Sequence, residues 1–176
     1  MKKIIALGAS NSKESINKRL AVFVANQLQN TETIIIDLND YDIPIYGIDY
    51  ETEHGIPAQI QELSNLIASV DGIVISMAEH NGSYSAAFKS MFDWLSRVDK
   101  YVWKNKPMFL MATSPGGRGG ITVLETAKNT FPRMGANLIA DFSLPSFYDN
   151  FSKNGITDDE LNNQLNAKID AFQKEI

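Results

Sequence analysis

Residues 3–17, KIIALGASNSKESIN, decide how the rest of the chain is interpreted. An apolar run is followed by a loop of small hydroxyl side chains and then by the amphipathic segment Ile16–Leu28. This order predicts a strand, a loop and a helix. A helix start carries unpaired N–H groups and a partial positive charge. Four side chains add donors around that point: Ser10, Ser12, Ser15 and Asn17. The sequence therefore predicts a seat for one phosphate group, although serine and asparagine also cap ordinary helices.

Apolar runs alternate with helical patterns along the chain. Short runs rich in β-branched or large residues predict strands at 3–8, 32–38, 72–77, 107–113 and 137–142. Apolar residues at helical spacing predict helices at 16–29, 57–70, 85–98, 120–131 and 158–174. Pro57 suits the first position of the second helix, and Thr157 to Glu160 is typical of a capping box. The stretch 39–56 is expected to be irregular and to fold over the rim.

This alternation predicts a single domain over residues 1–176, a doubly wound α/β sandwich. Five parallel strands favour the order 2-1-3-4-5, with helices on both faces of the sheet. Ligands of such sheets bind beyond the carboxyl ends of the strands, where the winding reverses. That point lies between the first and third strands. The loops that follow the first, third and fourth strands are therefore the candidates for function.

Composition excludes several classes of protein. The formal net charge of −5 argues against nucleic-acid binding, and the absence of cysteine excludes disulfides and thiol chemistry. Two isolated histidines are too few for a metal site. The chain begins with strand-like sequence rather than a signal peptide, and no apolar run approaches the roughly 20 residues of a membrane span. We therefore expect a cytoplasmic protein without membrane or nucleic-acid partners.

The two remaining loops have the composition of a ring-binding site. Ala78–Tyr84 follows the third strand, and its polar and aromatic residues suit a ring system; the alternative is a turn with Ser83 or Ser85 as a helix cap. Ser114–Gly120 contains four glycines in five positions, so its backbone can approach a flat ligand closely, although glycine loops also form plain turns. The dinucleotide fingerprint, the P-loop and the G-x-S-x-G motif are all absent.

Taken together, the three loops resemble the NAD(P)H-dependent FMN reductase family, the flavodoxin-like quinone, chromate and azo-dye reductases. The family's first loop reads approximately G-S-x-R-x-x-S-x-N, and its second reads P-E-Y-N-x-S before a helix with L-K-N-x-x-D-W-x-S-R. The matching residues here are Ser10, Ser15, Asn17, Glu79, Asn81, Ser83, Lys89, Asp93, Trp94, Ser96 and Arg97. Ser12 replaces the arginine, and Ala78 and His80 replace the proline and the tyrosine.

The resemblance implies an FMN-dependent oxidoreductase that uses NADPH or NADH and then reduces a quinone or another small electron acceptor. The implied phosphate ligands are Ser10, Ser12, Ser15, Ile16 and Asn17. The residues implied to line the flavin ring, mainly through backbone groups, are Ala78, Glu79, His80 and Asn81, with Ser114, Gly116 and Gly117 at its other edge. Flavin and solvent can manage the protons, so no side chain is assigned as a catalytic acid or base.

Two other functions stay open at this point. One is a flavodoxin-type electron carrier that binds FMN but does not react with NAD(P)H, and the other is an interaction module that has lost the cofactor. The resemblance also implies a homodimer or homotetramer. Trp94 lies off the apolar stripe of its helix, which predicts an outward-facing ring at a subunit contact; alternatively, it covers the rim of its own core. Asp93 and Arg97 are expected to pair within the helix or across that contact.

Overall fold

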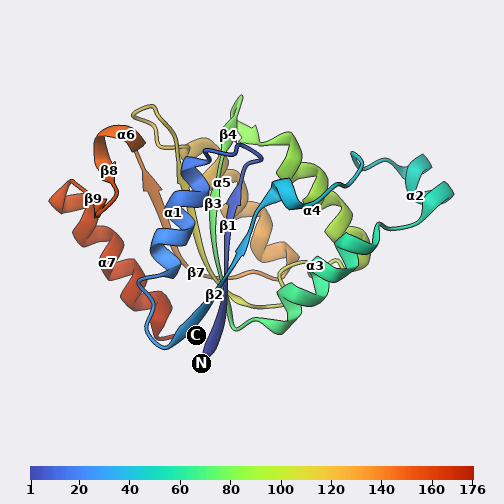
Figure 1. Cartoon of the computed structure of the whole chain (residues 1–176), viewed down its shortest axis with the longest axis horizontal. Helices are drawn as coiled ribbons and strands as arrows, with labels where there is room; N and C mark the ends of the chain where they lie inside the picture. Colours follow the sequence, from blue (N-terminus) through green and yellow to red (C-terminus); the bar gives the residue numbers. More distant parts are fainter.

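The computed structural model describes all residues from 1 to 176 and contains a five-stranded parallel sheet with helices on both faces (Figure 1). The strand order is β2-β1-β3-β6-β7, which confirms the order predicted from the sequence. The strands are β1 (Lys2–Ala9), β2 (Thr31–Ile36), β3 (Gly72–Met77), β6 (Pro107–Thr113) and β7 (Asn137–Leu144). The carboxyl ends of β1, β3 and β6 therefore meet at one edge of the sheet.

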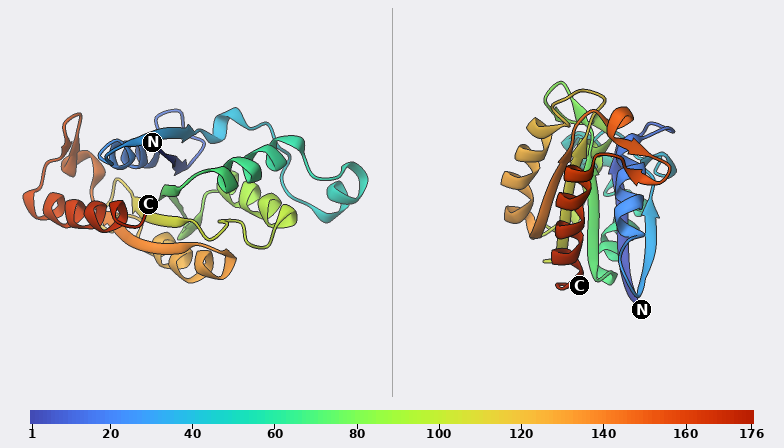
Figure 2. Two further views of the ribbon diagram at one scale, coloured as in Figure 1. Left: turned by 90° about the horizontal axis from the view of Figure 1, so that it is seen from below. Right: turned by 90° about the vertical axis from the view of Figure 1, so that its left-hand side faces the viewer.

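Helices cover both faces of this sheet, as the left panel of Figure 2 shows for α1 and α7 against α3 and α4. The helices are α1 (Ile16–Ala25), α3 (Ala58–Ser69), α4 (Ala86–Val98), α5 (Ile121–Thr130) and α7 (Asp159–Gln173). Alternate residues of each strand point to opposite faces, so Ile4 and Ile5 enter different apolar clusters. The cluster under α3, α4 and α5 has 27 buried residues, and the cluster under α1 and α7 has 17.

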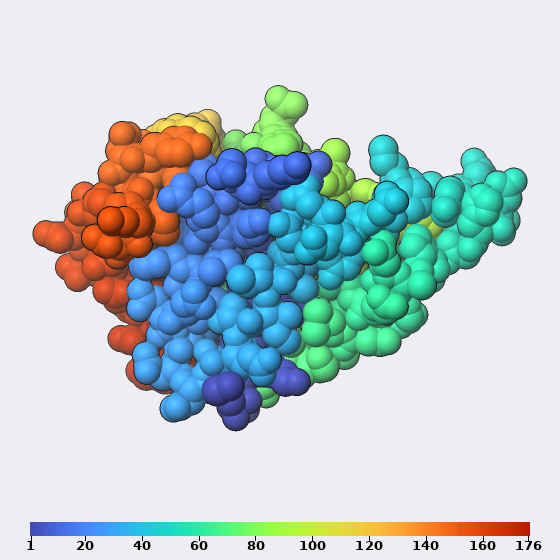
Figure 3. Space-filling view, viewed as in Figure 1, coloured from blue at the N-terminus to red at the C-terminus, as the bar shows by residue number.

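The stretch 39–56 is more ordered than the sequence predicts. It contains a 3₁₀ turn, η1 (Leu38–Asp40), and the short helix α2 (Ile48–His54). In Figure 3, α2 and the chain beside it project from the body of the molecule. Helix α2 contains too few apolar residues for the sequence to show the apolar stripe that predicts a helix. Ile45, which lies before α2, is 84% exposed.

The prediction that Trp94 faces outward is wrong. Its ring is fully buried, with 0% exposure, and its Nε1 donates a hydrogen bond to the carbonyl oxygen of Pro44 at 2.8 Å. The ring of Tyr46 meets it edge-on, with 5.0 Å between ring centroids. Helix α4 is thus covered by the sheet on one side and by residues 43–50 on another. Trp94 covers the rim of its own core, and it is no evidence for a subunit contact.

The expected pairing of Asp93 with Arg97 within the helix is also wrong. The carboxylate of Asp93 accepts from Lys89 Nζ at 2.7 Å, and Arg97 Nε donates to Glu51 of α2 at 2.9 Å. These ion pairs are partly solvated and contribute little on their own. The second of them nevertheless holds α2 against α4, together with the Trp94 contact.

Smaller differences concern the ends of the elements. Helix α7 is capped by Asp158, whose carboxylate accepts from Leu161 N at 2.9 Å, so the predicted capping box at Thr157 is wrong. Pro57 is the cap of α3 rather than its first residue. Short elements escaped the sequence analysis: η2 (Phe131–Met134), α6 (Phe147–Asn150) and the hairpin strands β8 (Phe151–Ser152) and β9 (Gly155–Ile156). No helix combines the length and the apolar character that crossing a membrane requires.

Replacing Asp37 with asparagine should lower the free energy of unfolding at pH 7 and have less effect as the pH falls. The Lys18 ammonium donates to the Asp37 carboxylate and thereby lowers the pKa of Asp37. A carboxyl with a lowered folded pKa contributes stability above its unfolded pKa of about 3.9, and loses it as the pH falls through the folded value. Urea unfolding between pH 7 and pH 2.5 measures this, with the exposed Asp40→Asn as control. A difference that does not shrink in acid would contradict it.

Candidate functional site

A pocket of about 200 Å³ lies at the carboxyl edge of the sheet, where the loops after β1, β3 and β6 meet. Nine of the twelve site residues predicted from the sequence line it. They are Ser10, Ser12, Ser15, Ile16, Asn17, Ala78, Glu79, His80 and Ser114. The other three, Asn81, Gly116 and Gly117, are exposed nearby in the same loops but do not line the pocket. The structure thus brings together residues that are more than 100 positions apart in the sequence.

The first loop presents hydrogen-bond donors around the start of α1. Ser10 Oγ accepts from the backbone N–H of Ser12, and Ser15 Oγ accepts from that of Lys18, both at 3.1 Å. Each hydroxyl therefore keeps its own hydrogen for another acceptor. Ile16 and Asn17 are the first two residues of the helix, so their N–H groups have no intrahelical acceptor. This set of neutral donors suits an anion at a helix start.

Asn17 links helix α1 to the sheet through side-chain hydrogen bonds. Its side-chain oxygen accepts from Ser76 Oγ at 2.7 Å and from Thr113 N at 3.1 Å, and its amide nitrogen donates to Thr113 O at 3.2 Å. All three residues are buried. The side chain thus joins α1 to the ends of β3 and β6 and fixes the three loops relative to one another. One amide hydrogen and the backbone N–H of Asn17 remain for a ligand.

The second loop is a β-hairpin followed by a capped helix. Strands β4 (Glu79–His80) and β5 (Ser83–Tyr84) are joined by Asn81 and Gly82, with φ angles of 53° and 76°. Two central residues with positive φ are characteristic of the tight turn that asparagine–glycine favours. The Asn-Gly pair was therefore the signal for this hairpin in the sequence. The cap of α4 is Ser85, one of the two predicted candidates; its Oγ accepts from Phe88 N at 3.2 Å.

Two further hydrogen bonds hold this loop against its neighbours. Ser85 Oγ donates to the carbonyl oxygen of Ala9 at 2.8 Å, which ties the hairpin to the end of β1. The Glu79 carboxylate accepts from the backbone N–H of Val123 at 3.0 Å, at the start of α5. The carboxylate of Glu79 is thus occupied by the protein itself, and His80 is exposed.

The glycines of the third loop fall into two groups. Gly119 and Gly120 have φ angles of 57° and 73°, and a Cβ at Gly119 would lie 2.5 Å from Ser143 Oγ. The fold itself therefore requires them to be glycine. Gly116 and Gly117 have ordinary φ angles, and a Cβ on either would have no atom of the protein closer than 4.0 Å. Nothing in the chain requires glycine there, which leaves the space free for a flat ligand.

Four residues that the sequence did not predict also line the pocket: Glu14, Thr113, Pro115 and Tyr148. Tyr148 comes from the segment after β7, which is held by hydrogen bonds from Ser146 N to Gly116 O and from Phe147 N to Ser114 O, each 3.0 Å long. The signal was available, because Pro145 to Tyr148 follows the fifth strand at the same edge. The sequence prediction covers only the loops after strands one, three and four.

The pocket has no lysine or arginine in its lining. Lys18 is held by Asp37 outside it, and Lys13 is exposed. Ser12 occupies the position where the family motif has arginine. An anion bound here would be held by N–H groups, hydroxyl groups and the start of α1, beside the carboxylates of Glu14 and Glu79, rather than by a fixed positive charge.

Comparisons with known proteins agree with this geometry. The model of the NADPH-dependent FMN reductase family matches residues 2–149. A quinone reductase of Escherichia coli is 38% identical over 79 residues, which are 45% of this chain and 42% of that protein. The chain thus matches less than half the length of this relative. An NADPH azoreductase of a Bacillus species is 26% identical over 137 residues, 78% of this chain and 72% of that protein.

A solved flavoenzyme, an NAD(P)H:acceptor oxidoreductase from Paracoccus denitrificans, has the same fold, which is flavodoxin-like. Its TM-score is 0.74 at 24% identity, and the superposition covers 99% of both chains. The three-layer sandwich, the three loops at its carboxyl edge and the match of the family model over residues 2–149 lead to one conclusion. This chain belongs to the NADPH-dependent FMN reductase family.

Proposed function

We propose that the protein is an FMN-dependent oxidoreductase that uses NAD(P)H to reduce a quinone-like or other small electron acceptor. The observation that carries the proposal is the convergence of three loops on one pocket with neutral donors at a helix start. The residues fit the cofactor on two counts. The donor set around Ser10 and Ser15 suits a phosphate, and the open space at Gly116 and Gly117 suits the edge of a ring.

Each loop has a distinct part in this proposal. When bound, FMN supplies hydride acceptance from a nicotinamide and delivery of electrons to an acceptor. The hydroxyls of Ser10, Ser12 and Ser15 and the N–H groups of Ile16 and Asn17 hold the phosphate. The hairpin backbone at Ala78–Asn81 would hold one edge of the ring, and the loop from Ser114 to Gly117 would hold the other. No side chain is assigned a proton-transfer role.

The test is an FMN titration followed by turnover. Protein mixed with FMN should bind it at micromolar concentration, and the complex should oxidise NADPH or NADH when a quinone is added. Rapid mixing of the FMN complex with each nucleotide separates a reductase from a simple electron carrier, because a carrier would bind FMN and react poorly. A protein that binds no FMN at these concentrations would overturn the proposal and favour an interaction module.

The variant Ser15→Asp probes the phosphate seat without removing the helix cap, because aspartate caps helices as well as serine does. Its carboxylate would repel the phosphate and remove a donor. We expect the Kd for FMN to rise about a hundredfold, since hydrogen bonds to charged groups contribute about 1.5–3 kcal/mol. Riboflavin, which lacks the phosphate, is the matched control ligand, and its Kd should change little. An equal loss for both ligands would place the phosphate elsewhere.

The oligomeric state is also a proposal. We infer a homodimer or homotetramer from the family, and the exposed apolar residues on the projecting segment support a contact between copies. They are Ile48 and Tyr50. Light scattering of the purified protein tests this, and a mass equal to one chain at all concentrations would remove the inference.

A further inference from the structure

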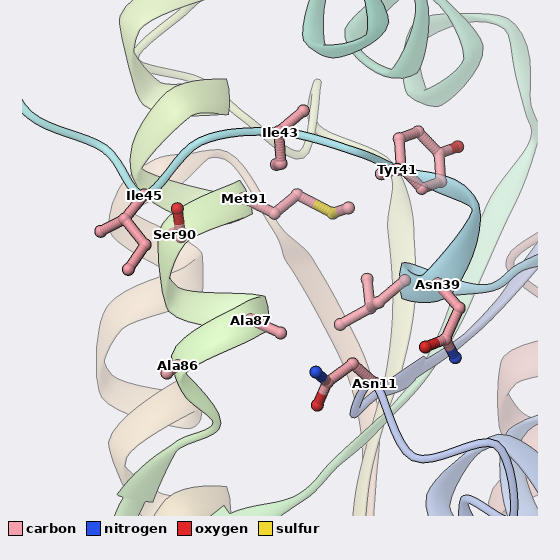
Figure 4. Close-up of a pocket in the computed structure, with 10 residues that line it drawn as sticks. Asn11, Asn39, Tyr41, Ile43, Ile45, Ala86, Ala87, Ser90 and Met91 are labelled. Atoms are coloured by element: carbon pink, nitrogen blue, oxygen red, sulfur yellow. The ribbon is translucent and has the colours of Figure 1, made fainter. Parts of the chain in front are cut away.

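A second and larger cavity, of about 390 Å³, lies beside the flavin pocket on the α4 side of the sheet (Figure 4). It opens between the segment 38–45, which we call the strap, and the first turns of α4. In Figure 4 the side chain of Met91 extends from α4 toward Tyr41 of the strap, and Ala87 faces the space between α4 and Asn11. The lining consists of Asn11, Leu38, Asn39, Tyr41, Ile43, Ile45, Ala86, Ala87, Ser90 and Met91. Its volume lies in the range of about 300–1,000 Å³ that is typical of small-molecule sites.

The lining of this cavity is apolar with two amides at its rim. No charged side chain lines it. The amide of Asn11 has no partner in the protein, and Asn39 uses its nitrogen to donate to Asp37 Oδ1 at 2.7 Å, which leaves its oxygen free. An amide that can donate and accept beside an aromatic ring and aliphatic side chains suits a flat heterocycle. Paired donor and acceptor groups of this kind are what asparagine uses to recognise adenine.

The position of the cavity relates it to the flavin pocket. Asn11 lines the cavity, whereas its neighbours Ser10 and Ser12 line the flavin pocket. The loop 10–12 is therefore the wall between the two. An electron acceptor that the flavin reduces directly must contact the ring. The part of a long molecule that is far from its reacting end does not have to contact the ring. The separation by one loop favours one end of an extended dinucleotide over a compact acceptor.

Two acidic residues of the strap lie beside the cavity. Asp40 and Asp42 are exposed on either side of Tyr41 on the strap. The pKa of Tyr41 is raised, first by burial and then by the nearby Asp40 and Glu62 carboxylates. No lysine, arginine or histidine lines the cavity to offset this field. An additional phosphate would thus be disfavoured, whereas an uncharged ring would not.

We propose that this cavity binds the adenosine end of the reduced dinucleotide, and that it selects NADH over NADPH because it rejects the 2′-phosphate. The inference rests on the proposed function, since it deepens the choice of reductant. Ser12 stands where the family motif has arginine, so one cation that could hold the 2′-phosphate is absent.

The first test is binding, and it needs neither flavin nor turnover. Titration of the protein with adenosine, followed by NMR, should shift the side-chain amides of Asn11 and Asn39 in a saturable manner. 2′-AMP should bind about tenfold more weakly than adenosine, because its phosphate meets the field of Asp40 and Asp42. Adenosine that shifts nothing, or 2′-AMP that binds more tightly, would overturn the proposal.

The second test blocks the cavity with Ala87→Phe. The KM of the FMN-loaded protein for NADH should rise about tenfold, while kcat and the Kd for FMN stay unchanged. Reduced nicotinamide mononucleotide lacks the adenosine, so its KM should not change. Ala58→Phe, in the first turn of α3 and exposed, is the matched control and should leave all values unchanged. If Ala87→Phe unfolds the protein, Asn11→Ala on the exposed loop serves instead.

The outcomes separate the two proposals. If the wild-type complex oxidises neither nucleotide, the proposed function fails, while adenosine binding still decides the assignment of the cavity. If the KM values for NADH and for reduced nicotinamide mononucleotide rise equally, Ala87 acts on the flavin side and the adenosine assignment is wrong. If adenosine does not bind and Ala87→Phe changes the mass of the particle in light scattering, the cavity is a contact between copies of the chain.

Discussion

Replacing Gly8 with alanine should destabilise the protein strongly and abolish FMN binding at the same time. A Cβ at this position would lie 2.3 Å from the backbone nitrogen of Lys18 and 2.5 Å from its Cα. Backbone atoms cannot rotate away as a side chain can, so the start of α1 would have to move off β1. We expect a loss of about 3 kcal/mol or more, which is a fall in Tm of about 6–12 °C for a chain of this size.

The control for this variant is Gly47→Ala. A Cβ at Gly47 would have no atom within 4 Å, and the backbone there is extended, with φ of −156°. Its replacement should change Tm by no more than about 2 °C. The comparison uses thermal unfolding and an FMN titration on each protein. If Gly8→Ala bound FMN normally, the close contact between β1 and α1 would not position the phosphate seat.

The second large effect is expected for Asn17→Leu. This change keeps the size of the side chain but removes the acceptor for Ser76 and for the Thr113 N–H, and the donor for the Thr113 carbonyl. Each buried polar group left without a partner costs about 1–3 kcal/mol, so the total should be about 3–5 kcal/mol. Urea unfolding measures it directly.

Asn166→Leu on the exposed face of α7 is the matched control for Asn17→Leu, and it should change stability by about 0.5 kcal/mol or less. A loss below about 1 kcal/mol for Asn17→Leu would show that the three loops are held by other contacts. The flavin Kd provides a second readout, because loosening α1 from β3 and β6 should weaken FMN binding even in the fraction that remains folded.

The sheet could be predicted from the sequence because its strands are buried on both faces. Such strands give uninterrupted apolar runs, so 72–77 and 107–113 match β3 and β6 residue for residue. The last helix differs by one residue at each end, and its cap is Asp158. Caps depend on the position of one hydrogen bond, which spacing alone does not determine.

The elements that were missed depend on tertiary contacts. Helix α2 is only seven residues long and is stabilised through Glu51 and the aromatic contacts of Trp94 rather than by its own pattern. Trp94 was expected to face outward because one apolar stripe was assumed to be the whole buried surface of α4. A helix covered on two sides buries a second stripe, and the residues that cover it are some 50 positions away in the sequence.

The residues that line the pocket were predicted more completely than the hydrogen bonds of their side chains. Nine expected residues line it because parallel strands bring their following loops to a common edge. The hydrogen bonds that these side chains make within the protein could not be predicted. Glu79 is an example, since its carboxylate is taken by Val123 N, and that bond depends on how α5 packs. The roles of the individual residues toward FMN remain predictions.

The two apolar clusters lie on opposite faces of the sheet, and this has a consequence for motion. The strap packs on the larger cluster through Tyr41 and Ile43, whereas α1 belongs to the smaller one. Local opening follows cooperative units of packing, so fluctuations of one face need not spread to the other. An opening of the strap would therefore disturb the larger cluster first, because the start of α1 packs on the other face of the sheet.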